Sequence, residues 1–109
     1  MTLEEFRQAL VAALERHFPQ AEVMLAESRG VVLTGRATLD TDTFVAIYFS
    51  ALTGKTSYAL IRQERRWVGY DNYKFWHYHP LENADRHEPC SAPTPEEAIA
   101  ELARVSKHL

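Results

Sequence analysis

From Thr2 to Phe18, apolar side chains recur three or four positions apart, the spacing of one face of an α-helix. Thr2 and Glu5 have the spacing of a capping box, in which a hydroxyl and a carboxylate each accept a hydrogen bond from the other residue's backbone. Pro19 cannot donate a backbone hydrogen bond and disfavours helix in the residue before it. The stripe consists of Phe6, Leu10, Ala13, Leu14 and Phe18. We predict a helix that ends before Pro19 and covers a sheet.

From Glu22 to Tyr70 the apolar period changes to two, which is typical of β-strands. Turn residues separate the segments, and gaps of only a few residues cannot hold crossover helices, so neighbouring strands should be antiparallel. A β-bulge is expected near Gly35, inside the second strand. The predicted strands are Glu22–Ala26, Val31–Leu39, Phe44–Leu52, Thr56–Gln63 and Trp67–Tyr70.

A second helix is predicted from Thr94 to the end of the chain. Thr94 and Glu97 again have capping-box spacing, and Pro95 suits the first helical turn. The apolar stripe of this helix consists of Ala98, Ile99, Leu102, Ala103 and Val105. Residues 1–109 should therefore form a single α+β domain, an antiparallel meander of four to six strands with an N-terminal and a C-terminal helix packed on one face.

Composition limits the function classes. The 109 residues carry a formal charge of −3, and a nucleic-acid binder of broad specificity normally has a basic excess. Cys90 is the one cysteine, so no intrachain disulfide can form. The acidic N-terminus does not resemble a secretory signal, and no apolar run is long enough to span a membrane. A cytoplasmic protein without membrane association is the expectation.

Residues 67–87 have an unusual composition: they contain three of the five histidines and half of the twelve aromatic residues. If the chain is extended from Trp76 to His79, His77 and His79 point to one face and Trp76 and Tyr78 to the other. The rise per residue then separates the two imidazoles by roughly 6–7 Å. That separation suits two histidines acting on one phosphodiester, or two ligands of one metal ion.

One interpretation of this segment is a ribonuclease site that needs no cofactor. One histidine would remove the proton from a ribose 2′-hydroxyl and a second would protonate the departing 5′ oxygen, roles that suit imidazole because its usual pKa of ~6.5 lies near neutrality. His77 and His79 are the candidate pair, with His87 as the alternative partner. Asp71 would orient an imidazole, and a cation would hold the phosphate. The candidate cations are Lys74 and Arg86.

A second interpretation is a zinc site. Four borderline-soft ligands that suit zinc lie within a short segment: His77, His79, His87 and Cys90. A third interpretation is a non-enzymatic module that forms a homodimer or a heteromeric complex through exposed aromatic residues. Trp76 would then belong to the interface, whereas in the ribonuclease interpretation it would contact substrate.

The order of several short motifs resembles the TumE toxins of prokaryotic toxin–antitoxin modules. The motifs are Tyr70-Asp71-Asn72, His77-Tyr78-His79-Pro80, His87-Glu88-Pro89-Cys90 and Pro93-Thr94-Pro95-Glu96-Glu97. The resemblance covers roughly residues 22–105. An arginine often precedes the aromatic-Asp-Asn motif in such proteins, whereas Gly69 stands there in this chain, with Arg65 and Arg66 a few residues upstream.

The resemblance implies an RNA-cleaving toxin that a separate antitoxin neutralises, commonly one with a helix-turn-helix domain. It also implies a functional set of Asp71, Asn72, His77, His79 and His87. RNA and an antitoxin protein are therefore the expected partners, and a homodimer is an open alternative.

Overall fold

Two helices of the computed structural model, which describes residues 1–83 and 85–109, begin at capping boxes. Helix α1 spans Leu3–His17 and helix α2 spans Pro95–Ser106. In each, the threonine side chain accepts a hydrogen bond from a backbone amide three residues later, and the glutamate there accepts one from the threonine's amide. These reciprocal bonds satisfy amides that would otherwise lack partners at the helix start.

The strands form one antiparallel sheet in which every strand pairs with its neighbours in the sequence, in the order β1-β2-β3-β4-β5-β6-β7. The strands are β1 (Glu22–Ser28), β2 (Val32–Thr38), β3 (Thr43–Ser50), β4 (Thr56–Arg62), β5 (Arg65–Asp71), β6 (His77–His79) and β7 (Glu88–Pro89). Neighbouring strands joined by short connections give a meander.

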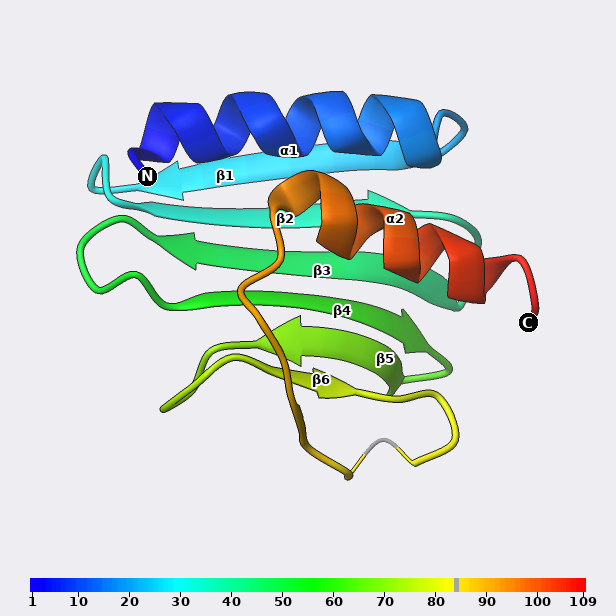
Figure 1. The fold of residues 1–109 in the computed structure, drawn as a ribbon. Coiled ribbons are helices and arrows are strands. Elements are labelled where there is room, and N and C mark those ends of the chain that lie inside the picture. The colour runs from blue at the N-terminus through cyan, green and yellow to red at the C-terminus, as the bar shows by residue number, and fades with distance from the viewer. Residues whose placement is uncertain (84) are drawn as a thin grey trace.

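Both helices lie over the same face of the sheet, as Figure 1 shows. Helix α1 packs over β2 and β3, and α2 packs over β4 and β5 and against α1. Buried side chains of this face meet the two apolar helix stripes; Phe6 of α1, for example, stacks on Phe49 of β3 with ring centroids 4.2 Å apart. In the part of the chain that the structure describes, no helix combines the length and apolar character needed to cross a membrane.

The α+β class, the antiparallel meander and the two helices on one face agree with the sequence analysis. In the described residues the sheet has more strands than the four to six expected. The difference comes from β6 and β7, which contain only three and two residues. The predicted bulge at Gly35 is wrong: the register runs regularly through the Gly35–Ile47 pair. The irregularity lies instead between Leu60 and Ile61 in the β4–β5 pair.

Strand alternation divides β5 and β6 between the two faces of the sheet. Val68 is buried in the core under the helices, and Tyr70 and Tyr78 pack against that core. Because successive side chains point to opposite faces, Asp71, His77 and His79 project from the face that the helices leave uncovered. The sheet thus holds the chemically reactive segment on its outer face.

Candidate functional site

A single carboxylate joins two histidines on the outer face. Asp71 and His77 are directly opposite each other in the β5–β6 ladder, and His79 is the next residue of β6 on the same face. Asp71 Oδ1 lies 2.8 Å from His77 Nε2, and Asp71 Oδ2 lies 2.8 Å from His79 Nε2. One aspartate therefore orients both imidazole rings of the predicted His-x-His pair.

The electrostatics of Asp71 favour its ionised form. Burial acts to raise the pKa of this carboxyl group. Hydrogen bonds from His79 and from the Tyr73 amide, together with attraction from His77 and His79, outweigh burial and leave the pKa of Asp71 below its ordinary value. An ionised carboxylate only accepts hydrogen bonds, so the Nε2 atom of His79 donates the one it shares with Asp71.

His77 has both ring nitrogens engaged. Its Nδ1 lies 2.9 Å from the carbonyl oxygen of Phe75, which can only accept a hydrogen bond, and its Nε2 faces Asp71. The two ring nitrogens of His77 thus both face oxygen atoms. With 4% of its surface exposed, His77 is buried and held between Asp71 and the Phe75 carbonyl.

His87 completes a cluster of three imidazoles. Its ring centroid lies 4.7 Å from that of His77 and 4.4 Å from that of His79. One ligand atom from each of the three residues falls within 4.8 Å of the others. His77 and His79 are buried and His87 is exposed, so His87 is the histidine that solvent reaches directly.

The cluster lies in an open hollow of about 280 Å³. Two cationic side chains, Arg66 from β5 and Lys74 from the β5–β6 connection, contribute to its wall. Arg66 also lines a second hollow of about 480 Å³ with Arg65 and Trp67. The histidine site therefore has positive charge beside it although the whole chain is acidic.

Gly69 explains how β5 comes close enough to build this arrangement. A Cβ atom at this position would lie 2.6 Å from the carbonyl oxygen of Tyr58 and 3.3 Å from Ala59 Cα, so any side chain would force β4 and β5 apart. Gly69 is also the residue opposite His79 in the β5–β6 ladder. The lack of a side chain there leaves room for His79 to reach diagonally to Asp71.

The structure brings together Asp71, Lys74, His77, His79 and His87 of the predicted site residues. The other predicted residues lie elsewhere. Asn72 has a structural role, since its side chain accepts a hydrogen bond from the Thr56 amide at 2.8 Å and donates one to the Gly54 carbonyl at 2.9 Å.

Trp76, Arg86 and Cys90 do not line the hollow. Trp76 is partly buried and packs against the core, on the face away from the histidines. Arg86 forms an exposed ion pair with Glu88 at 3.3 Å. Cys90 is not part of the group of described residues placed to bind a metal ion, and burial raises the pKa of its thiol, which disfavours the thiolate that zinc requires.

Three residues of the hollow were not among the predicted site residues: Arg66, Tyr73 and Phe75. A signal for two of them is present in the sequence, because 71, 73, 75, 77 and 79 share the same parity and would share a face of one extended chain. The alternation of residues along the sequence does not identify Arg66. The register shift between Leu60 and Ile61 pairs Arg66 with Ile61 and so changes the alternation along β5.

Comparisons of the chain with protein-family models, with curated proteins and with solved structures find no match.

Proposed function

We propose that the chain is a toxin-like endoribonuclease that cleaves RNA by histidine general acid–base catalysis without a metal ion. The observation that carries the proposal is the pairing of Asp71 with His77 and His79 beside the exposed ring of His87. Oriented imidazoles next to cations are the groups that intramolecular transesterification of RNA requires.

In the proposed reaction, one histidine takes the proton of the ribose 2′-hydroxyl while the 2′ oxygen attacks phosphorus. The bond from phosphorus to the 5′ oxygen breaks, and a second histidine gives that oxygen a proton. The products are a 2′,3′-cyclic phosphate and a free 5′-hydroxyl. Arg66 and Lys74 stabilise the charge that develops on the phosphoryl oxygens.

We assign His87 to one of the two proton transfers, with His79 as the nearer histidine partner. Their ring centroids are 4.4 Å apart, both line the hollow, and His87 is open to solvent. His77 lies slightly farther from His87, with ring centroids 4.7 Å apart. We assign Asp71 to positioning, because it pairs with both His77 and His79.

Cleavage of synthetic RNA in the presence of a chelator tests the proposal. The wild-type protein should produce ends with a 2′,3′-cyclic phosphate, and a 2′-deoxy substitution at the scissile nucleotide should prevent cleavage. His87→Ala should lower kcat by about 10²–10⁴-fold, because that is the usual contribution of a general acid or base. His108→Ala, at the end of the chain, is the matched control and should keep full activity. Unchanged cleavage by His87→Ala would contradict the proposal.

The resemblance to TumE toxins extends the proposal to a protein partner, an antitoxin with a helix-turn-helix domain. A small gene of that kind beside the gene for this chain would support the extension. Co-expression of its product should relieve growth inhibition caused by the wild-type chain. A neighbouring protein that neither binds the chain nor relieves inhibition would argue against this partner.

The cluster of His77, His79 and His87 favours a divalent metal site as a second candidate function. The bond from His77 Nδ1–H to a backbone carbonyl is typical of a metal-bound histidine, but zinc would have to displace Asp71 from the Nε2 atoms. Calorimetric titration with Zn²⁺ separates the two candidates. A tight site that is lost in His87→Ala, together with cleavage that a chelator abolishes, would favour the metal.

A further inference from the structure

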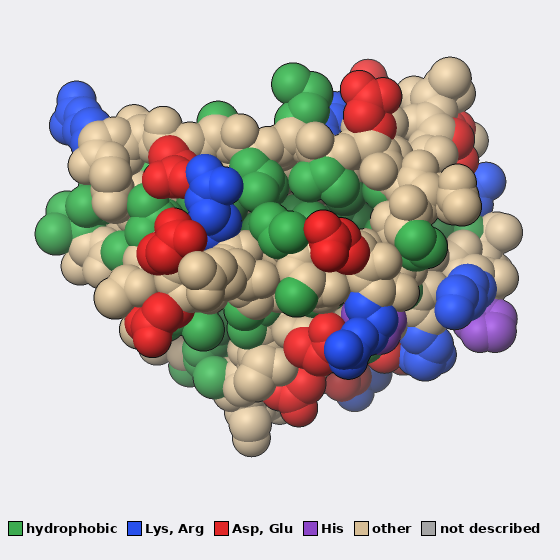
Figure 2. Space-filling view, turned by 90° about the horizontal axis from the view of Figure 1, so that it is seen from above, with side chains coloured by type: hydrophobic (Ala, Val, Ile, Leu, Met, Phe, Trp, Pro, Cys, Tyr) green, Lys and Arg blue, Asp and Glu red, His purple; other side chains and the backbone are tan. Residues whose placement is uncertain are grey.

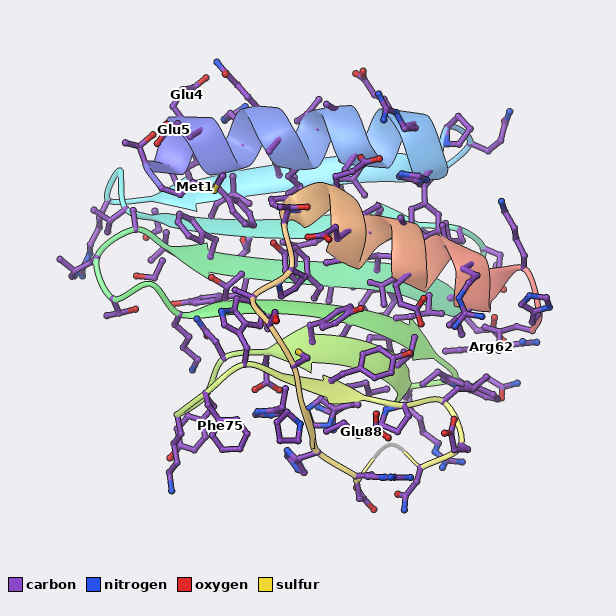
Figure 3. All side chains as sticks on the ribbon, viewed as in Figure 1. Met1, Glu4, Glu5, Arg62, Phe75 and Glu88 are labelled. Carbon is purple, nitrogen blue, oxygen red and sulfur yellow. The ribbon has the colours of Figure 1, made fainter. Side chains whose placement is uncertain are left out.

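The rim of the histidine hollow carries two exposed aromatic side chains, Tyr73 and Phe75, with Lys74 between them. Tyr73 is 67% exposed and Phe75 is 53% exposed. Figure 3 shows Phe75 in the connection between β5 and β6, directed away from the sheet. Aromatic rings this open to water beside a candidate active site suggest a binding role rather than a packing role.

The backbone holds this aromatic segment in a defined conformation. At its start, the Tyr73 amide donates a hydrogen bond to Asp71 Oδ1 at 3.2 Å, and Asn72 is tied to Gly54 and Thr56. At its end, the Phe75 carbonyl accepts a hydrogen bond from His77. The two rings are therefore presented to solvent by a segment that is anchored to the catalytic cluster itself.

Lys74 adopts a left-handed backbone conformation with φ of 70°, which non-glycine residues rarely adopt. Its Nζ lies 5.6 Å from the Tyr73 ring centroid. The segment thus places a positive charge near the Tyr73 ring, with Phe75 the next residue along the chain. That pattern matches a nucleic-acid strand, in which negative phosphates alternate with flat bases.

We propose that Tyr73 and Phe75 stack on unpaired nucleobases next to the scissile phosphate, so that the substrate is single-stranded RNA. This inference rests on the proposed ribonuclease function. Phe75 lies edge-on to His77 with ring centroids 5.2 Å apart, so a base on Phe75 belongs to a nucleotide adjoining the phosphate at the histidines. Bases inside a duplex are stacked on each other and do not offer their faces to these side chains.

Binding is tested first, with a short single-stranded oligonucleotide that carries 2′-O-methyl groups and therefore cannot be cleaved. A 2-aminopurine base, whose fluorescence falls on stacking, is placed at each position in turn. The wild-type protein should quench it at one or two adjacent positions. Phe75→Leu and Tyr73→Leu should each weaken binding about ten-fold or more and reduce that quenching, since they remove the aromatic face but keep an apolar side chain.

Two further variants distinguish stacking from general damage to the surface. Phe75→Tyr keeps an aromatic ring and should bind as the wild type does. Met24→Ala removes a 68% exposed apolar side chain on β1, at the opposite edge of the sheet, and should leave binding and quenching unchanged. A loss of binding in both of these variants would show that the effect of the leucine variants is not specific to stacking, which would overturn the inference.

Cleavage provides an independent readout through an abasic substitution. Removal of the stacked base from an RNA substrate should lower kcat/KM of the wild-type protein by about the same factor as Phe75→Leu or Tyr73→Leu. The same removal should have no further effect in the matching variant, because the contact is already lost. Closing the target sequence into a stable duplex should lower cleavage by the wild type to a similar or greater extent.

Failure of this inference and failure of the proposed function give different results. Cleavage that neither leucine variant nor the abasic substitution alters would overturn stacking and leave the ribonuclease intact. Quenching that depends on Phe75 without cleavage of any RNA would overturn the ribonuclease but retain base stacking. If the leucine variants change only the association of the chain with a protein, the aromatic pair is a protein interface and the inference is wrong.

Discussion

Asp71 accepts hydrogen bonds from His79 Nε2 and from the Tyr73 amide, and its Oδ1 lies 2.8 Å from His77 Nε2. In Asp71→Asn the amide group retains one acceptor oxygen, while its nitrogen donates and would face an N–H of His77 or His79. We expect this variant to lose about 1–3 kcal/mol of unfolding free energy near neutral pH, the usual cost of an unsatisfied buried polar group. Urea unfolding measures the loss, and equal stability of the two proteins would contradict the bridging role of Asp71.

The difference in stability between the wild type and Asp71→Asn should also depend on pH. The pKa of Asp71 is lower in the folded state than its ordinary value near 3.8, so near that pH the unfolded chain binds more protons. The stability contributed by Asp71 is therefore fully present above about pH 4 and is lost as the pH falls through the lower, folded value. The stability difference between wild type and Asp71→Asn should narrow on acidification below about pH 4. A difference that stayed constant down to pH 2 or grew would contradict the lowered pKa.

Lys74 combines an unfavourable backbone conformation with a position on the hollow. Lys74→Ala and Lys74→Gly both remove the cation, but only glycine adopts a positive φ without a steric cost. Both variants should lose RNA cleavage to a similar degree, whereas Lys74→Gly should be more stable than Lys74→Ala by about 1 kcal/mol. Thermal unfolding and cleavage rates of the two variants check this. Full activity in either one would exclude Lys74 from phosphate binding.

At the scale of elements, side chains of strand β6 form contacts both within the sheet and with the helix layer. Its outward side chains, His77 and His79, bond to Asp71 of β5, while Tyr78 points to the helix layer. The Tyr78 hydroxyl donates a hydrogen bond of 2.7 Å to Glu101 of α2, which Arg104 also contacts. Burial and the contact with Glu101 raise the pKa of Tyr78, so the hydroxyl remains a donor. A strand of three residues is thereby held in a fixed register.

We expect Tyr78→Phe to lower the free energy of unfolding by about 1–2 kcal/mol, because the variant loses a hydrogen bond to an ionised acceptor that Arg104 still pairs. Tyr48→Phe, on the outer face of β3, is the matched control and should change stability by no more than about 0.5 kcal/mol. Urea unfolding midpoints of the two variants provide the comparison. Equal losses of unfolding free energy in the two variants would show that the contact between Tyr78 and Glu101 does not stabilise the packing of β6 against α2.

Helices and long strands were predictable because local rules determine them. The two capping boxes and the change from helical to two-residue periodicity between Pro19 and Glu22 need no tertiary information. Strands β6 and β7 were harder to predict because segments of three and two residues have too few positions to show a period. Strand β6 pairs with β5, β7 pairs with β6, and Tyr78 of β6 bonds to Glu101 of α2, which is distant in the sequence.

The candidate site was predictable in its residue types and less so in its geometry. The alternation of His77 and His79 indicated one shared face, and the ladder confirms it. The sequence pattern does not show the register of β5 against β6. That register places Asp71 between the two imidazole rings. The ribonuclease interpretation assigned Trp76 to substrate although alternation placed it opposite the histidines; Trp76 packs against the core, and Phe75 lines the hollow instead.

For the whole molecule, the net charge is −3, whereas the side chains beside the histidine site carry positive charge. Figure 2, seen from above over α1, shows acidic and basic side chains mixed with apolar ones and no continuous basic surface. Positive charge at the histidine hollow comes from Arg66 and Lys74. A strand of RNA would therefore meet attraction from two cations at the hollow of a chain whose net charge is negative.

This distribution predicts a weak salt dependence of RNA binding. Each phosphate contact with a single strand changes log K by about −0.7 per decade of salt, so the two cations should give a slope of about −1.4. Fluorescence titration of an uncleavable 2′-O-methyl oligonucleotide over a range of salt concentrations measures it. Lys74→Ala should reduce the slope by about 0.7, whereas Lys107→Ala, at the end of α2, should leave it unchanged. A slope steeper than about −4 would mean that the chain binds RNA over a much wider surface than the histidine hollow.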